Sequence, residues 1–211
     1  MKSAKAQNTK TPPRRRQQKA RRQEEILTAA FDVFAARGYE ATRIDDVARR
    51  AGIAKGTIYL YFRDKERLFQ AVVRNLIPKR FDVLVDSVPG PPEELLGLLL
   101  SQFYTNVVKS EKVPLIFRML VAESGRFPEL AEIYHREIIV PGMKAVRKVL
   151  ERGVAEGVFR NTKALEFPQM IAGAGLLAMV WQLLFGRHHA LDLDTYMKAH
   201  GEFVLRSLKR D

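Results

Sequence analysis

Residues 42–62 contain two short helical patterns joined by a glycine turn, and this feature restricts the possible folds of the chain more than any other. The first pattern has apolar residues at three- and four-residue spacing: Ile44, Val47, Ala48 and Ala51. Gly52 can end that helix with a positive φ, and Ile53 places an apolar side chain inside the turn. A second helix follows, with Ile58 and Phe62 facing inward. The pattern predicts a helix-turn-helix.

The segments on either side of this pair are also predicted to be helical. A helix over about residues 22–37 ends at Gly38, which suits a left-handed C-cap. Thr42 and Asp45 have the spacing of a capping box at the start of the next helix, with Asp in place of the usual Glu. Asp64 is expected to cap a fourth helix. The pair therefore stands inside a larger helical unit.

The outward residues of the second short helix suit contact with DNA. Lys55 supplies charge, Gly56 permits close approach of the backbone, and Thr57 can bond a phosphate or touch a thymine methyl. Tyr59 and Tyr61 carry hydroxyl tips that can reach the groove walls. For Tyr59 the alternative is a core position against the preceding helix. An exposed helix with these residue types predicts major-groove binding.

The positive charge is concentrated at the N-terminus. The net charge is +12, and residues 1–23 hold nine lysines or arginines and no acid, whereas the rest holds 27 bases and 24 acids. Pro12 and Pro13 interrupt this segment, so we expect a flexible basic arm over residues 1–22. Such an arm suits nucleic acid or an anionic membrane surface, and a solubilising tail is the alternative. On DNA, residues 14–22 would add affinity that does not depend on sequence.

Several motifs in this region carry a family resemblance. They are IL-AA-F from Ile26, RGYEAT from Arg37, AG-I at Ala51, KGTIYLYF from Lys55 and DKERLF from Asp64. Residues 24–69 resemble the N-terminal domain of the tetracycline-repressor (TetR) family of bacterial regulators. The resemblance implies an all-α fold with a helix-turn-helix DNA-binding domain over residues 23–69 and a helical ligand-binding and dimerisation domain over 70–211.

The resemblance also implies which residues contact DNA. The matching positions are Thr42, Arg43, Ala54, Lys55, Gly56, Thr57, Tyr59, Tyr61 and Lys65. Lys65 begins a helix, where its charge and the free N–H groups can hold a phosphate. Ala54 stands where the family commonly has Ser or Thr, Tyr61 where it commonly has His, and Arg43 where it often has a small hydroxyl residue. The operator sequence therefore cannot be copied from relatives.

The rest of the chain is rich in apolar helical segments. The resemblance implies that they bind a small hydrophobic or aromatic effector, which shifts the fourth helix and spreads the two DNA-reading heads. The candidate ligand-binding residues are Phe103, Tyr104, Val107, Phe117, Leu120, Glu123, Tyr134, Met143 and Trp181. For each of them the alternative is an ordinary filled core or, for the polar ones, the surface.

Residues 167–186 contain no charged side chain over 20 positions. This length can span a membrane, but a buried helix of a dimer core explains the same composition. The resemblance implies that the last two long helices form a four-helix interface between two subunits. The candidate interface residues are Gly173, Leu176, Leu177, Val180 and Leu184. A homodimer also suits two half-sites of a palindromic DNA operator.

Other function classes find little support. The chain has no cysteine, which excludes disulfides and thiolate metal sites and fits a reducing cytoplasm. His188 and His189 precede Asp192 and Asp194, but they fall in a loop without metal-ligand spacing. No phosphate loop or nucleophile motif occurs, so we expect neither an enzyme nor a cofactor. The basic start is not followed by the apolar segment of a secretory signal.

We therefore expect a cytoplasmic, homodimeric, ligand-responsive repressor that binds double-stranded DNA and no membrane. One alternative is an activator or a regulator that needs no ligand. The alternative from a different class is a membrane-associated helical protein whose basic arm meets anionic lipid.

Overall fold

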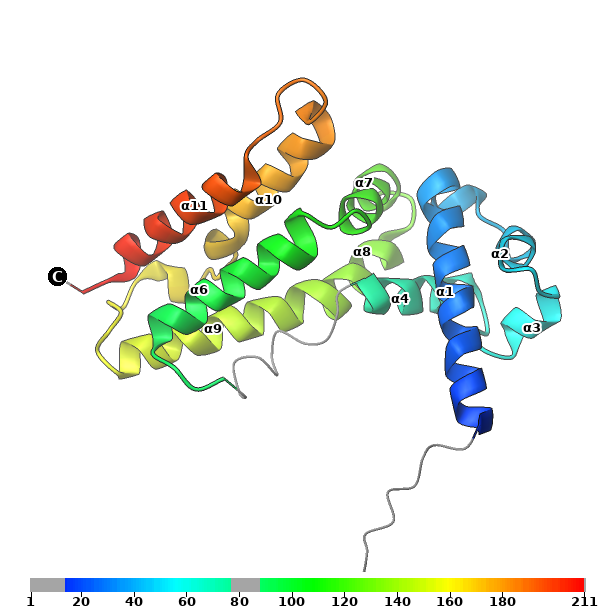
Figure 1. Ribbon diagram of the computed structural model, residues 1–211, viewed down its shortest axis with the longest axis horizontal. Coiled ribbons are helices and arrows are strands. Elements are labelled where there is room, and N and C mark those ends of the chain that lie inside the picture. The colour runs from blue at the N-terminus through cyan, green and yellow to red at the C-terminus, as the bar shows by residue number, and fades with distance from the viewer. Residues whose placement is uncertain (1–13, 77–87, 211) are drawn as a thin grey trace, which may run out of the picture.

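The computed structural model describes residues 14–76 and 88–210 (Figure 1). Within them all regular structure is helical, apart from one isolated antiparallel bridge between Phe159 and Lys209. The first part holds α1 (Arg14–Ala41), α2 (Ile44–Ala51), α3 (Lys55–Tyr59) and α4 (Lys65–Leu76). The second holds α6 (Pro92–Phe103), η1 (Tyr104–Val108), α7 (Val113–Glu123), α8 (Pro128–Tyr134), η2 (His135–Ile139), α9 (Val140–Ala155), η3 (Lys163–Leu165), α10 (Gln169–Phe185) and α11 (Leu193–Leu208). The all-α expectation is confirmed.

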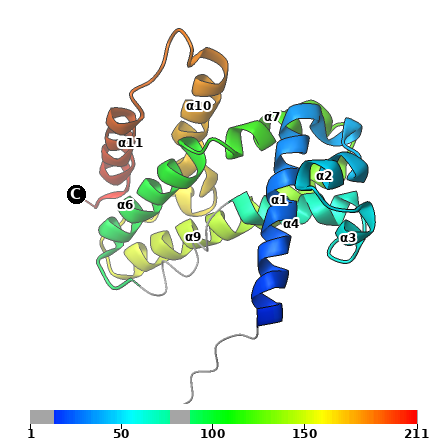
Figure 2. The ribbon, with the colours of Figure 1, turned by 45° about the vertical axis from the view of Figure 1, so that its right-hand side comes forward.

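The first four helices share an apolar core that holds α3 at one end of the molecule. Ile26 and Phe34 of α1, Ile58 of α3 and Phe69 of α4 are all buried. The rings of Phe34 and Phe69 meet edge to face, with centroids 5.4 Å apart. Figures 1 and 2 place α2 and α3 at the end farthest from α11. Burial of the predicted apolar stripes thus leaves the outer side of α3 free.

The start of α1 differs from the expected flexible arm. The helix begins at Arg14, so residues 14–22 are helical, whereas residues 1–13 lie outside the described part. Arginine, glutamine, lysine and alanine favour helices, which explains the extension. Ion pairs from Arg21 and Arg22 to Glu25, one helical turn on, add to it.

The second half is a layered helical bundle. Figures 1 and 2 both show α6 between α9 on one side and α10 with α11 on the other. Leu96 of α6, Val149 of α9 and Val204 of α11 are buried in one cluster. The short helices α7 and α8 lie between this bundle and α1 with α4, so they join the two halves.

Several boundaries in this half differ from the predicted ones. The expected helix over 128–157 is divided by the π-helical turn η2, which lies directly before Val140 and Pro141, where the sequence predicts a kink. A proline ring clashes with the carbonyl four residues before it, here that of Glu137, and a wide turn relieves the clash. The helix expected from Thr162 begins only at Gln169, because Pro168 disfavours helical geometry in the residue before it. The predicted extension of the fourth helix to residue 87 lies outside the described residues.

Among the residues that the structure describes, no helix is both long and apolar enough to cross a membrane.

Candidate DNA-binding surface and effector cavity

The turn between α2 and α3 forms as the sequence predicts. Gly52 has a φ of 65°, and its N–H bonds back to the end of α2. Ala54 is the N-cap of α3 and provides no side-chain cap, as its methyl group requires. Arg43 rather than Thr42 is the N-cap of α2, and neither forms a capping box. Thr42 is 2% exposed and its hydroxyl donates to the carbonyl oxygen of Gly38 at 2.6 Å, so its side chain cannot reach DNA.

The outer side of α3 presents the expected residues. Ile58 and Phe62 are buried, whereas Lys55, Gly56 and Tyr59 are exposed. The exposed fraction of Tyr59, 47%, excludes the alternative core position. Thr57 and Tyr61 are half-buried. The Lys55 ammonium donates to Asp45 of α2 at 2.8 Å, which holds it beside the turn.

One exposed apolar residue of this surface escaped the sequence analysis. Leu60, directly after α3, is 80% exposed. An apolar side chain of this kind can contact thymine methyl groups in the major groove. The spacing that marks Ile58 and Phe62 as inward-facing also points Leu60 outward, so the signal was present in the sequence.

Basic side chains surround α3 on two sides. One shallow hollow joins Lys19 and Arg22 of α1 to Thr57, Leu60 and Tyr61. A second hollow joins Tyr61 to three arginines, which are Arg63, Arg67 and Arg74. The basic residues at the start of α1 therefore lie beside the α3 surface on a regular helix. This position suits contacts to DNA phosphates.

Lys65 has a structural role that the sequence did not indicate. Its ammonium donates to the backbone carbonyl oxygens of Tyr39, Glu40 and Thr42, at 2.9, 3.2 and 3.3 Å. It also lies 4.3 Å from the centre of the Tyr39 ring. Burial lowers the pKa of Lys65. In place of the expected phosphate contact, Lys65 therefore binds the backbone that connects α1 to α2.

Glu123, expected to bind ligand, binds the same corner instead. Its carboxylate oxygens accept hydrogen bonds from the backbone N–H groups of Tyr39 and Glu40, at 2.9 and 2.8 Å. Gly38 has a φ of 79° at this point, and a Cβ there would clash with the Glu123 carboxylate. The end of α7 is thereby tied to the DNA-facing half of the molecule.

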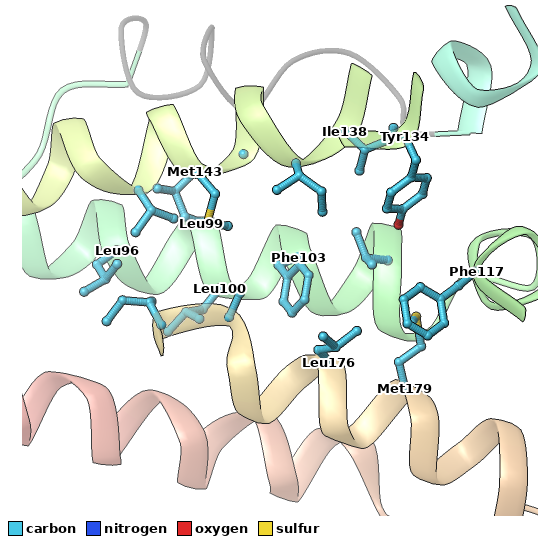
Figure 3. Close-up of a pocket in the computed structure, with 16 residues that line it drawn as sticks. Leu96, Leu99, Leu100, Phe103, Phe117, Tyr134, Ile138, Met143, Leu176 and Met179 are labelled. Atoms are coloured by element: carbon cyan, nitrogen blue, oxygen red, sulfur yellow. The ribbon is translucent and has the colours of Figure 1, made fainter. Parts of the chain in front are cut away.

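An apolar cavity of about 150 Å³ lies between α6, α9 and α10 (Figure 3). Five of the predicted ligand-binding residues line it: Phe103, Val107, Phe117, Tyr134 and Met143. The lining also includes Leu96, Leu99, Leu100, Ile138, Ile139, Gly142, Val146, Ile171, Ala172, Leu176 and Met179, which were not predicted. Tyr134 contributes the only polar side chain among these described residues. Such an apolar lining suits a hydrophobic molecule.

The other four predicted ligand-binding residues lie elsewhere. The Tyr104 hydroxyl lies 3.0 Å from His200 Nδ1 in a buried pair, and burial raises the pKa of Tyr104 to about 12 and lowers that of His200. Leu120 is buried in the core, and Glu123 binds the α1 corner. The Trp181 indole N–H donates to the carbonyl oxygen of His189 at 2.6 Å, at the end of α10. None of the four reaches the cavity.

Glu137 of η2 forms a second link between the cavity and the DNA-facing half. Its carboxylate accepts hydrogen bonds from Gln70 Nε2 at 2.8 Å and from Arg74 Nε at 2.6 Å, both on α4. Burial alone would raise the pKa of Glu137, but the bonds from Arg74, Gln70 and Arg136 outweigh it and lower the pKa to about 2. The neighbouring residue Ile138 lines the cavity. One π-helical turn thus carries both a lining residue and the α4 contact.

The predicted dimer residues lie on an exposed apolar side of α10. Gly173, Leu176, Leu177 and Leu184 are exposed, and Val180 is half-buried. Other large apolar residues are exposed as well: Met170, Trp181 and Phe185 on α10, and Phe203 on the next helix, α11. Leu176 differs from the rest because it also lines the cavity. The histidine and aspartate positions considered above form no metal-binding group within the described residues.

Comparisons with known proteins agree with this geometry. Residues 26–72 match the family model of the tetR family of bacterial regulatory proteins, and residues 96–191 match the C-terminal domain of AefR-like transcriptional repressors. The HTH-type transcriptional repressor KstR2 of Mycolicibacterium smegmatis is 30% identical over 144 residues, which cover 65% of this chain and 67% of that protein. KstR2 of Rhodococcus jostii is 28% identical over 193 residues, covering 87% and 89%.

Among solved structures, the fold is similar to that of the transcriptional regulator FadR from Bacillus subtilis in complex with stearoyl-CoA. The TM-score is 0.72 at 21% identity, over 87% of this chain and 98% of that chain. From the matching family models, the KstR2 relatives and the shared fold it follows that this chain belongs to the TetR family of helix-turn-helix transcriptional regulators.

Proposed function

We propose that this protein is a dimeric transcriptional repressor that leaves a palindromic operator when a small apolar effector enters the cavity. The observation that carries the proposal is the apolar cavity between α6, α9 and α10. Its lining comes from helices that also hold the DNA-facing half, through Glu123 of α7 and Glu137 of η2. Occupation of the cavity can therefore bias the position of α4 and α3. Action on chromosomal DNA would place the protein in the cytoplasm.

The relatives support the parts of this proposal separately. KstR2 of Mycolicibacterium smegmatis is named a transcriptional repressor, and the FadR structure contains stearoyl-CoA, whose acyl chain is apolar. The proposal assigns residues 23–69 to DNA binding and residues 70–211 to effector binding and dimerisation. Helix α4 crosses that boundary, since it runs from Lys65 to Leu76, and this suits an element that connects the two functions.

The proposed dimer rests on the exposed apolar side of α10. Met170, Leu177 and Leu184 follow one another at seven-residue spacing, and Phe203 of α11 is 74% exposed. Clustered large apolar side chains on a surface are typical of an interface between proteins. A two-fold contact through α10 and α11 would give two α3 helices, as a palindromic operator requires.

Replacement of Tyr59 by alanine should weaken operator binding about tenfold, because a groove contact of this kind contributes about 1–3 kcal/mol. Fluorescence anisotropy with a labelled palindromic fragment from the DNA upstream of the gene measures the affinity. Val121→Ala on α7 is the matched control, since Val121 is exposed far from α3 along the chain and should not change binding. Equal affinities of the two variants would exclude α3 as the reading helix.

The effector site is tested by filling the cavity. Gly142 lines it, and a Cβ at this position meets no atom within 4 Å, so Gly142→Leu should fit and occupy the space. We expect this variant to bind an apolar probe such as propylbenzene about tenfold more weakly, because the contact area is lost. Calorimetry measures the affinity for the probe, and fluorescence anisotropy measures release of the labelled operator.

Gly97→Leu on α6 is the matched control for the cavity variant. Gly97 does not line the cavity, and a Cβ there also meets open space. It should bind the probe and the operator as the unmodified protein does. If Gly142→Leu still binds the probe and releases DNA normally, the cavity is not the effector site.

A further inference from the structure

Tyr134 is a buried polar group that has no hydrogen-bond partner among the described residues. It is 9% exposed, and no other residue of the described part of the chain forms a hydrogen bond with its hydroxyl. Figure 3 shows the hydroxyl directed toward the interior of the cavity, opposite Phe117. No unpartnered side-chain oxygen of the described residues is sealed from solvent, so the Tyr134 oxygen opens onto the cavity. Burial raises its pKa to about 12, which keeps the phenol neutral and able to donate.

The rest of the lining, as far as the structure describes it, offers no charge to a ligand. Of the sixteen described residues that line the cavity, the fifteen besides Tyr134 are aliphatic, aromatic, glycine or methionine. A carboxylate placed among these side chains would lose its hydration and gain no cation in return. A neutral oxygen placed opposite Tyr134 would lose its hydration as well, but it would accept the phenol hydrogen bond.

We infer that the effector is neutral where it enters the cavity and carries one hydrogen-bond acceptor, such as a ketone, ester or hydroxyl oxygen, on an otherwise apolar body. This inference rests on the proposed function, because it specifies the ligand of the same cavity. Tyr134 then orients the effector, and the absence of charge in the described lining rejects free carboxylic acids at neutral pH. The cavity of about 150 Å³ suits a body the size of a substituted benzene.

Three probes of similar size test the inference with the full-length protein. Propylbenzene is apolar, propiophenone adds one neutral carbonyl, and 3-phenylpropionate carries a charge. Calorimetry should show that Tyr134→Phe weakens the binding of propiophenone about tenfold, because its carbonyl loses the hydrogen-bond donor. The affinity for propylbenzene should change little. The carboxylate should bind unmodified protein at least about tenfold more weakly than propiophenone.

A second measurement does not depend on the variant. The infrared carbonyl stretch of bound propiophenone should lie at lower frequency than in an alkane, since a hydrogen bond weakens the C=O bond. An unshifted stretch, an equal effect of Tyr134→Phe on both neutral probes, or tight carboxylate binding would overturn the inference and leave the apolar effector site intact. If neither neutral probe binds the unmodified protein, the proposed function fails together with the inference.

Discussion

Replacing Gly38 by alanine is expected to lower the free energy of unfolding by about 3 kcal/mol. Its backbone, with φ at 79° and ψ at 176°, occupies a region that is essentially confined to glycine. A Cβ would also collide with the Glu123 carboxylate, which accepts the N–H groups of Tyr39 and Glu40. The strain and the lost hydrogen bonds each contribute about 1–3 kcal/mol. Urea unfolding followed by circular dichroism measures the change.

A double-mutant cycle separates the two causes. If the carboxylate clash contributes, Gly38→Ala should cost less in a Glu123→Ala background than alone. Gly201→Ala on α11 is the control, because it is helical, meets open space and should be neutral or slightly stabilising. A Gly38→Ala protein as stable as the unmodified one would contradict the described corner. We also expect Glu123→Ala to bind the operator normally without effector. It should release the operator less in the presence of effector, because α7 loses its hydrogen bonds to the end of α1.

Much of the local structure of this corner could be predicted, but not its long-range partners. The sequence around Gly38 indicates a helix end with positive φ. The structure confirms the positive φ, but with ψ at 176° Gly38 is a non-helical kink within α1, which continues to Ala41, rather than a left-handed C-cap. The pairing with Glu123 joins residues 84 positions apart, and nothing in the local pattern indicates it. The same holds for Lys65, whose place at a helix start suggested a phosphate contact while its ammonium binds three carbonyl oxygens. A charged residue near a helix end can serve either purpose, and only the tertiary fold decides.

The cavity shows a second limit of the sequence. The pattern over residues 93–110 is apolar nearly all round, so it predicts burial without stating which side faces a ligand. The π-helical turn η1 begins at Tyr104 and shifts the phase of the residues that follow. Phe103 and Val107, four residues apart, line the cavity together, whereas Tyr104 turns to His200. For α10 the sequence predicted a helix buried between two subunits. In the single chain Gly173, Leu176, Leu177 and Leu184 are exposed and Val180 is half-buried, and the interface itself stays a prediction.

The second large effect is expected at Glu137, which joins η2 to α4. Glu137→Gln should lower the free energy of unfolding by about 2 kcal/mol at pH 7, because the charge-assisted bonds from Arg74 become weaker. Arg74 is itself largely exposed, which keeps the loss below that of a fully buried pair. The pKa of Glu137 lies at about 2 in the folded protein, below its ordinary value of 4.5, so folding favours the ionised form. Its contribution is complete above about pH 4.5 and is lost as the pH falls toward 2.

Urea unfolding of both proteins between pH 7 and pH 3 tests this prediction. The stability difference should be largest at neutral pH and should narrow below pH 4.5, as the unmodified carboxylate takes up its proton. Glu132→Gln provides the control, since Glu132 is exposed on α8 and should give no such difference. A gap that stays constant with pH would show that the variant acts through packing rather than charge. Glu137 does not line the cavity, so Glu137→Gln should bind propylbenzene normally. Because Glu137 connects the lining residue Ile138 to α4, the same variant should release the operator less completely. If the Glu137 carboxylate both stabilises α4 and transmits the effector signal, its replacement by glutamine must lower the stability and the operator release together.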